Sequence, residues 1–393
     1  MINIEKKKEC CGCRACESIC PTSAISFNND TEGFWYPKVD LEKCINCHKC
    51  EKTCPWLGER TSHMDVAVCY ALKNKDIESR INSSSGGIFP ALANQILSMG
   101  GVIFGAQFDS LWQVESGYVE SVNQLHKLRR SKYVQSNNLE AYKNVLNFLK
   151  QGRKVLFTGT PCQSLALRKY LHKDYENLYV VDIVCHGVPS PLVWNRYLNE
   201  ISKKFRESID NIEDIKFKYK DKKRYIWRHP GFKIVWKDDK KYEVFSNKTG
   251  YENGFLTNLF VRPSCHDCKI KKLTSNSDIT IGDFWGVEKI LPTFYDEEGV
   301  SIAMVQTERG RELFDAVKGT FSVTSITIDE ATRYNQRIVV SSTANRNRNK
   351  FFSKLNSEEP IDEIVKRCLK PNKLSPCYIK NQLKKYIKDR IKL

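Results

Sequence analysis

The sequence has no uninterrupted apolar run of the length that a membrane-spanning helix needs. Its longest uncharged stretch, residues 81–108, is broken by asparagines, serines, a proline and several glycines, whereas a spanning helix needs about 20 apolar residues. Residues 1–9 are charged and lack an apolar core, so we expect no signal peptide. These two absences predict a cytoplasmic protein without a transmembrane segment.

The sequence also lacks the common nucleotide-binding and nucleic-acid-binding signatures. It contains no P-loop, zinc-finger or RNP motif and no G-x-G-x-x-G fingerprint. The formal net charge is +17, but metal clusters held by thiolates are anionic, so part of the basic excess can offset cofactors. We therefore expect no nucleic-acid partner and no standard Rossmann site.

Cysteine, by contrast, is abundant, with 16 residues in the chain. In a reducing cytoplasm, cysteines in this number indicate metal ligation and not disulfides. Eight of them form one pattern twice, C-x2-C-x2-C-x3-C followed by proline, and the second copy begins 34 residues after the first. The two copies are Cys10, Cys13, Cys16 and Cys20 before Pro21, and Cys44, Cys47, Cys50 and Cys54 before Pro55.

This spacing is typical of bacterial ferredoxins with two [4Fe-4S] clusters, in which the fourth cysteine of each copy ligates the other cluster. We predict a first cluster on Cys10, Cys13, Cys16 and Cys54, and a second on Cys44, Cys47, Cys50 and Cys20. Zinc is the alternative, but it needs four ligands and does not explain three closely spaced cysteines plus Cys-Pro, repeated. Cys11 lies outside the pattern and is interpreted as a bystander, and His48 as a solvated side chain.

Beyond residue 65, predicted strands and helices alternate, which favours an α/β domain with its site in the loops at the strand ends. The predicted strands are 66–72, 101–108, 114–119, 154–158, 178–184 and 302–306, and the predicted helices are 88–98, 139–150, 163–172 and 309–317. Residues 216–245 alternate and are rich in Tyr, Trp, Lys and Val, which predicts antiparallel strands with a basic face. The predicted fold class is α+β: a ferredoxin module (1–58) followed by an α/β domain with an antiparallel β insertion.

The rest of the chain is divided by composition. We predict domains at 65–200 and 201–340 and a basic tail at 341–393, which has fourteen Lys or Arg and five acidic residues. Ile379, Leu383 and Ile387 would fall on one helical face with basic residues around them, so a weak membrane-surface or partner contact is one hypothesis. A solvated, mobile tail is the interpretation that the charge favours.

Two loops of small residues follow predicted strands. Ser83 to Gly87 precedes the helix at 88–98, and Thr158-Gly159-Thr160 ends the strand at 154–158. Small residues let backbone N–H groups approach a phosphate, and a helix N-terminus favours its negative charge, although Ser is also an ordinary N-cap. Together the loops predict a nucleotide-like cofactor at Ser84, Ser85, Gly86, Gly87, Thr158, Gly159 and Thr160.

Four further cysteines occupy turn-like contexts, each within two residues of Gly, Pro or His: Cys162, Cys185, Cys265 and Cys268. Cys162 and Cys185 each follow a predicted strand, and parallel strands place their carboxyl ends at one sheet edge. We predict that the four thiolates hold a third [4Fe-4S] cluster. The alternatives are that His186 or Asp283 replaces one ligand, or that Cys162 and His186 form a nucleophile pair. The cysteines interpreted as structural are Cys69, Cys368 and Cys377.

Five motifs follow one another between residues 65 and 290. They are Ser84-Ser85-Gly86-Gly87, Thr158-Gly159-Thr160-Pro161-Cys162-Gln163, Cys185-His186-Gly187-Val188-Pro189-Ser190, the Cys265/Cys268 pair and Gly282-Asp283-Phe284-Trp285-Gly286. In kind and order they resemble the motifs of the coenzyme F420 hydrogenase/dehydrogenase beta-subunit family, a group of iron–sulfur flavoproteins; F420 is a deazaflavin coenzyme. An N-terminal ferredoxin module is a common companion of this family.

The resemblance implies bound FAD, with the two small-residue loops, His186 and Asp283 around it, and a cluster on the third cysteine set. It makes residues 65–200 a flavin-binding domain and residues 201–340 the family's C-terminal domain. Relatives include F420-reducing subunits, a chlorophyll-derivative reductase and bacterial proteins found with polysaccharide biosynthesis genes. A small-molecule or glycan-precursor substrate and a redox-protein partner are therefore expected, although the basic C-terminal extension fits none of the characterised activities.

Clusters carry one electron at a time, organic hydride chemistry needs two, and a flavin converts between them. The sequence thus predicts an iron–sulfur flavoprotein oxidoreductase that passes electrons between the ferredoxin module, the third cluster, FAD and an organic substrate, in either direction. The alternative hypothesis is an electron-transfer subunit that has no substrate site and serves a separate catalytic partner. A weaker alternative is a zinc-stabilised binding module.

Overall fold

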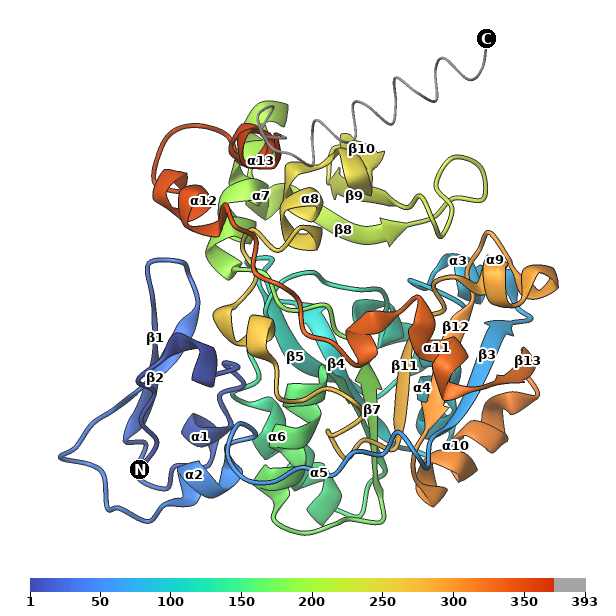
Figure 1. Cartoon of the computed structure of the whole chain (residues 1–393), viewed down its shortest axis with the longest axis horizontal. Coiled ribbons are helices and arrows are strands. Elements are labelled where there is room, and N and C mark those ends of the chain that lie inside the picture. Colours follow the sequence, from blue (N-terminus) through green and yellow to red (C-terminus); the bar gives the residue numbers. More distant parts are fainter. Residues whose placement is uncertain (371–393) are drawn as a thin grey trace.

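Residues 1–370, which the structure describes, form three β-sheets in a computed structural model (Figure 1). The largest is an eight-stranded mixed sheet in the order β13-β3-β12-β11-β7-β6-β4-β5. In Figure 1 the N-terminal module, with its two-stranded sheet, lies to the left of this central sheet, and the three-stranded sheet lies above it.

The N-terminal module is a small hairpin with two short helices. Its elements are η1 (Lys7–Glu9), α1 (Ala15–Ser18), β1 (Ile25–Asn29), β2 (Trp35–Val39) and α2 (Lys49–Thr53). The strands pair antiparallel, and Ile2, Cys16, Ile25 and Cys50 form a buried core. Because so few apolar side chains are available here, the cysteines themselves make up much of the interior.

The internal repeat of the cysteine pattern is also a repeat of backbone turns. Arg14 and His48, which precede α1 and α2, are both left-handed, with φ of 64° and 57°. Gly12 and Asn46, two residues earlier in each copy, are left-handed as well. Turns of this kind curl a short loop back on itself, so consecutive cysteines in each copy can face a common point.

The central sheet contains the strands that the alternating pattern predicts and two more. Its strands are β3 (Val68–Asn74), β4 (Val102–Phe108), β5 (Val114–Val119), β6 (Val155–Gly159), β7 (Leu178–Ile183), β11 (Ile279–Asp283), β12 (Ser301–Val305) and β13 (Phe321–Ile326). The segments β4, β6, β7 and β11 run parallel, and the outer strands pair antiparallel. Central strands such as β6 have both faces covered, which explains their continuous apolar sequence.

Helices cover both faces of this sheet and confirm the predicted mixed α/β architecture. They are α4 (Ile88–Ser98) and α10 (Glu308–Lys318) on one face, and α5 (Ala141–Lys150) and α6 (Pro161–Leu171) on the other. All ten predicted strands and helices of this region are present, with ends within two residues of the predicted ones. Strands from both sides of residue 200 share the sheet, so segments 65–200 and 201–340 have one core in common.

The parallel strands fix where the loops meet. The strands β6, β7 and β11 end at Gly159, Ile183 and Asp283 and point the same way. Parallel strands bring the loops after them to the same sheet edge. The neighbour β12 is antiparallel and starts at this edge, because Ser301 pairs with Asp283.

The three-stranded sheet is built from the segment whose alternation predicts antiparallel pairing. Its strands are β8 (Ile212–Tyr219), β9 (Gly231–Trp236) and β10 (Lys241–Phe245), and the helices α7 (Pro191–Phe205) and α8 (Gly250–Leu256) cover it. Aromatic side chains fill the space between them; Trp194, for example, lies 5.3 Å from Phe217 and 5.2 Å from Tyr251, centroid to centroid. This layer is therefore a second core, stacked above the central sheet.

The interpretation of residues 341–370 as part of a solvated tail is wrong. This segment forms α12 (Arg348–Lys354) and α13 (Ile361–Leu369), and its apolar side chains join the aromatic core, with Phe351 and Ile361 fully buried. Lys350, Lys354, Lys366 and Arg367 of these helices are exposed, so the net charge of the segment is a misleading guide here. The hypothesis for Ile379, Leu383 and Ile387 concerns residues outside those that the structure describes.

The remaining helices are short and connect the larger elements. They are α3 (Ile77–Ile81), α9 (Val287–Ile290), α11 (Ile328–Arg333) and the 3-10 turns η2 (Val122–Lys127), η3 (Ile209–Asn211), η4 (Ser246–Lys248), η5 (Pro263–Asp267), η6 (Pro292–Phe294) and η7 (Gln336–Ile338). Among all helices of residues 1–370, none has the length and apolar character to cross a membrane.

The β6 core gives a first testable prediction. Leu156 is fully buried beneath α4, in the strand that leads to Thr158 and Cys162. Leu156→Ala should lower the free energy of unfolding by about 2–5 kcal/mol, because it leaves a cavity. Urea denaturation measures this, with Leu111→Ala, at a side chain that is 65% exposed, as the control that should leave the unfolding midpoint in place.

Candidate functional site

The first predicted cysteine set is brought together in the structure. Burial, with the neighbouring thiols of Cys10 and Cys54, raises the pKa of the Cys16 thiol well above its usual range. Burial, with Cys10 nearby, likewise raises the pKa of Cys54. Cys13 also lies near Cys16 and Cys54, whose charges disfavour its own thiolate. The fourth cysteine of the second copy thus lies with the first three cysteines of the first copy.

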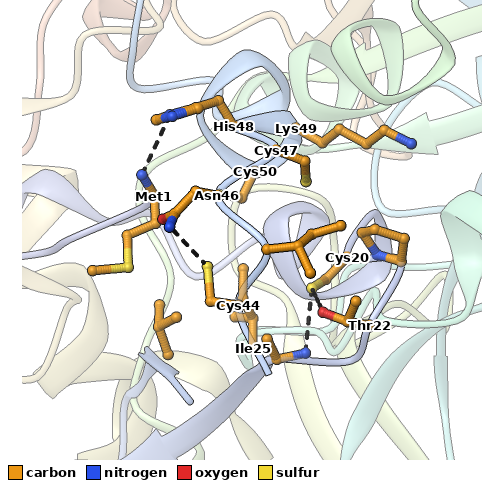
Figure 2. A pocket seen from close by; sticks show the side chains of 14 residues that line it. Met1, Cys20, Thr22, Ile25, Cys44, Asn46, Cys47, His48, Lys49 and Cys50 are labelled. Carbon is orange, nitrogen blue, oxygen red and sulfur yellow. Dashed lines mark hydrogen bonds between the residues drawn. The ribbon is translucent and has the colours of Figure 1, made fainter. Parts of the chain in front are cut away.

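The second set shows the reciprocal exchange. Cys20, from the first copy, lines one pocket together with Cys44, Cys47 and Cys50 (Figure 2). Backbone N–H groups point at these sulfurs: Ala24 donates to Cys20 Sγ at 3.3 Å, and Ile2 donates to Cys50 Sγ at 3.3 Å. Such bonds stabilise thiolate ligands of iron–sulfur clusters and tune their reduction potentials.

The thiol spacing disfavours zinc. A single zinc ion needs four ligand atoms close to one point, with Zn–S distances of about 2.3 Å. Across residues 1–370, no three or more His, Cys, Asp or Glu side chains are grouped closely enough to hold one metal ion. His48, as expected, is exposed and contacts Glu51 at 2.8 Å.

The third predicted set also converges, from three separate segments. Cys162 stands in the first turn of α6, where Thr160 and Gln163 form a capping box that fixes the loop. Burial, with the nearby Cys162 and Cys268, raises the pKa of Cys185 to about 12. Burial, with Cys185 and Cys268, also raises the pKa of Cys265 far above its usual value.

Gly187 allows the Cys185 loop to approach Cys265. Its φ is +142°, and a Cβ built on it would lie 3.2 Å from Cys265 Cβ and 2.7 Å from Val261 Cγ1. A side chain at this position would push the two loops apart. The Cys-His-Gly motif thus has a steric reason for its glycine, and the glycine keeps the third set together.

Cys11 lies between the first and third sets, although its position outside the repeat predicts a bystander. Its thiol interacts with Cys13 on one side and with Cys162 on the other, and the Cys13 contact is the largest cause that raises the pKa of Cys11. Its only sequence signal is that the second copy has an isoleucine, Ile45, in the equivalent position.

An apolar seam joins the same two sets. Trp56, Leu165 and Ile270 pack together, and around them lie cysteines of both sets and Cys11: Cys11, Cys54, Cys162 and Cys268. Trp56 belongs to the segment after α2, and Leu165 to α6. The N-terminal module therefore docks on the central domain where the first and third sets approach each other.

The Ser83–Gly87 loop lies at the carboxyl edge of the sheet, but its small residues already have partners there. Gly86 N donates to Ser301 Oγ at 2.8 Å, and a Cβ on Gly86 would lie 2.6 Å from the Leu72 carbonyl oxygen. Gly87 is the left-handed N-cap of α4. Close packing on β3 and β12 thus explains Gly86, and the left-handed N-cap explains Gly87, without a ligand. Ser84 Oγ contacts Ser131 Oγ at 3.0 Å, and Ser85 Oγ donates to Val300 O at 3.0 Å.

The segment 128–133, which no sequence motif marks, links the two small-residue loops. Ser131 N donates to Ser84 Oγ at 2.8 Å. At the other end, Leu128 and Thr158 both lie against Gly105 of β4. The segment carries three cations, Arg129, Arg130 and Lys132, and burial lowers the pKa of Lys132 to about 7.

Asp283 is tied to the three-stranded sheet. Its carboxylate accepts from Lys218 Nζ at 2.7 and 2.9 Å and from Trp227 Nε1 at 2.6 Å. Burial opposes the charged form of Lys218, but Asp283 outweighs it and raises the pKa of the amine. The ring of Trp285 stacks on Trp227 at 5.0 Å. Lys218 and Trp227 belong to the site geometry although no motif contains them.

His186 is half-buried and contacts Asn258. Its Nε2 lies 2.7 Å from Asn258 Oδ1, and its ring lies 5.0 Å from that of Phe255. Burial lowers the pKa of His186. The structure places it in the third-set loop, whereas the Cys162 thiol interacts with Cys11 and with Thr160 Oγ1 at 3.2 Å. This geometry does not favour a Cys162–His186 nucleophile pair.

Comparisons with known proteins agree with this geometry. Residues 9–57 match the model of the 4Fe-4S dicluster domain, and residues 152–330 match that of the C-terminal region of the coenzyme F420 hydrogenase/dehydrogenase beta subunit. The fold and the cysteine sets define an iron–sulfur protein of the oxidoreductase class. More specifically, the resemblance to the F420 hydrogenase/dehydrogenase beta-subunit family is confirmed by the match over residues 152–330.

Among solved structures, the chain is similar to a chain of the F420-reducing [NiFe] hydrogenase complex from Methanosarcina barkeri. The similarity covers 72% of this chain and 92% of that chain, with 18% sequence identity and a TM-score of 0.44. No curated protein shows a significant match to the sequence.

The buried Lys218–Asp283 pair gives a second prediction. Asp283→Asn leaves the ammonium of Lys218, whose side chain is 7% exposed, without its counter-charge and should lower the free energy of unfolding by about 3–5 kcal/mol. Urea denaturation is the measurement. Asp238→Asn, which removes one of the two carboxylate partners of the exposed Lys240, is the control at an exposed pair and should behave as wild type. An equal response of the two variants would contradict the buried-pair account.

Proposed function

We propose that the protein is an iron–sulfur flavoprotein oxidoreductase whose three cysteine sets hold three [4Fe-4S] clusters. The observation that carries the proposal is the convergence of Cys162, Cys185, Cys265 and Cys268 beside the first set. When thiols are buried together, burial and mutual repulsion disfavour their thiolate forms. Iron bound among them supplies the positive charge that such a set needs, as metal ions do at other thiolate sites.

The donor chemistry supports the same assignment. Each set offers four sulfur ligands, the type that iron–sulfur clusters require. The family models matched over residues 9–57 and 152–330 support iron–sulfur chemistry in both parts of the chain. For the third set, the proposal is that all four ligands are cysteines and that His186 and Asp283 are not among them.

The sheet edge offers groups that suit a flavin. Ser84, Thr158 and the segment 128–133 gather there, and the segment contributes two arginines and a lysine. Cations and hydroxyl groups at such an edge fit the diphosphate of FAD. When bound, the clusters would transfer one electron at a time, and the flavin would couple these single-electron steps to two-electron chemistry on a substrate.

Electron balance then limits the reaction. Two electrons leave a redox-protein partner, which is oxidised, and arrive together with protons on an organic substrate, which is reduced; the reverse direction balances equally well. The description of the matched family makes a deazaflavin such as F420 one candidate substrate. A small-molecule or glycan precursor is the other, from the resemblance to bacterial relatives.

Iron content tests the third set. Wild-type protein, reconstituted anaerobically, should hold about twelve irons, four for each of three clusters. Cys268→Ser should hold about eight and keep the spectroscopic signals of the ferredoxin module, and electron delivery to added FAD should slow sharply. Cys69→Ser, at a buried cysteine of β3, is the control and should keep about twelve. Full iron content in Cys268→Ser would place the third cluster elsewhere or remove it.

Flavin content tests the sheet edge. Wild-type protein reconstituted with FAD should release one FAD per chain on denaturation, measured by fluorescence. Ser84→Glu puts a carboxylate where the proposal places phosphates and should weaken FAD binding about tenfold or more, equivalent to about 1.4 kcal/mol. Ser98→Glu, an identical change at the exposed end of α4, is the control. Absence of FAD from reconstituted wild type would reject the flavin.

A further inference from the structure

Arg262 connects the first and third cysteine sets. Its backbone lies between the two loops of the third set, because Arg262 N donates to Val188 O at 2.9 Å and Arg262 O accepts from Cys265 N at 3.0 Å. Its side chain reaches into the N-terminal module, where Nε donates to Cys10 O at 2.8 Å and Nη2 to Trp35 O at 3.0 Å. One residue therefore touches a ligand cysteine of each set.

The guanidinium is completely enclosed. Arg262 is 0% exposed, and its charge lies 4.3 Å from the ring centroid of Tyr36 and 5.5 Å from that of Phe34. Its remaining hydrogen bond runs from Nη1 to Gln135 Oε1 at 3.2 Å. Its hydrogen-bond partners are thus neutral oxygens, and none of them carries a counter-charge.

A buried cation without a counter-ion is costly. Among residues 1–370, no carboxylate lies within ion-pair distance of Arg262, whereas 24 such pairs occur elsewhere. The groups that favour its charge are the thiols of Cys10, Cys11 and Cys265 and the phenol of Tyr36. Cys10 and Cys265 are the proposed cluster ligands, so the natural counter-charge of Arg262 is the pair of clusters.

The second set has a different electrostatic environment. Its pocket is lined by the exposed Lys49 and by Met1, whose N-terminal ammonium is solvent-exposed and is paired with Glu51 at 2.6 Å. Water and Glu51 both screen that charge. A buried guanidinium is screened far less, because the medium around it polarises weakly.

We propose that Arg262 is a positioning residue that sets the reduction potentials of the clusters in the first and third sets together. Reduction adds negative charge to a cluster, and a buried cation stabilises the reduced form, so Arg262 raises both potentials relative to that of the second cluster. The proposal rests on the proposed function for the third set, whereas its part for the first set depends only on the ferredoxin module.

The test is a redox titration of the reconstituted full chain, followed by EPR, with signals assigned by difference against Cys268→Ser. In Arg262→Gln the ratio of reduced to oxidised cluster in the first and third sets should fall at least tenfold at fixed ambient potential, equivalent to about 59 mV for a one-electron couple. The potential of the second cluster should stay at its wild-type value. Arg262→Lys keeps the charge and should keep all three potentials near wild type.

A control variant at Arg348 separates the effect of the Arg262 charge from the effect of anchoring the N-terminal module. Arg348 pairs with Glu32 of the N-terminal module and so anchors the same module from another side. Arg348→Gln should leave the potentials in place. Equal shifts in Arg348→Gln and Arg262→Gln, or in Arg262→Lys and Arg262→Gln, would overturn the charge account in favour of loosened packing, and unshifted potentials in Arg262→Gln would overturn it outright.

Gln135→Glu provides the same test without removing the side chain. It places a carboxylate against Arg262 Nη1, and the expected shifts of the first and third clusters are again negative. This variant decides the question if Arg262→Gln does not fold, which circular dichroism will show. A wild type with only about eight irons would refute the third cluster and the proposed function, while the shift of the first cluster would still decide the role of Arg262.

Discussion

Ionisable thiols that are buried side by side repel one another once they are charged, and this constraint organises much of the molecule. The first and third cysteine sets and Cys11 share one apolar seam. Cationic side chains that bind the backbone of these cysteines reduce the repulsion. Lys169 Nζ donates to Cys54 O, Lys271 Nζ donates to Cys185 O, and Arg262 Nε donates to Cys10 O. Because these contacts run to carbonyl oxygens, the cations are held near the sulfurs without being neutralised by carboxylates.

The N-terminal module is anchored to the rest of the molecule at two places. At one end, Trp56 packs on Leu165 of α6 and Ile270. At the other, the β1–β2 turn is held by the Glu32–Arg348 pair and by Ser190 Oγ, which donates to Glu32 O at 2.5 Å. The helix α12, which composition alone assigns to a tail, therefore has a positioning role: it holds the N-terminal module against the central domain. A module anchored at two ends keeps the spacing between the two sets constant, as electron transfer between them requires.

Local signals in the sequence were sufficient for the ferredoxin module and for most of the α/β elements. Cysteine spacing is a one-dimensional pattern, and the exchange of Cys20 and Cys54 between the copies follows from a known motif. The strand order is a different matter, because β11, β12 and β13 enter the sheet after an excursion of nearly a hundred residues through the three-stranded sheet. Hydrophobic periodicity carries no information on such long-range pairing.

The residues that sequence reasoning missed are those whose role depends on that pairing. Arg262 and Lys218 look like two cations among 63 in the sequence, and only the fold buries them. Cys11 breaks the spacing, so the sequence alone marks it as a bystander, yet its thiol lies between Cys13 and Cys162. The error for residues 341–370 has a similar origin, because the net charge of a segment does not show whether its apolar residues share one helical face.

The carboxyl edge of the sheet separates the two functional hypotheses. A subunit that only relays electrons needs cluster ligands and a docking surface, and the seam alone supplies the first of these. The edge adds a buried Lys218–Asp283 pair, the Trp227–Trp285 stack and the cations of segment 128–133. Buried charges are weak contributors to stability when apolar residues could replace them, so stability does not explain this concentration. Charges at the edge where α/β folds bind ligands are therefore the ground on which we propose an oxidoreductase with a site of its own and not a relay.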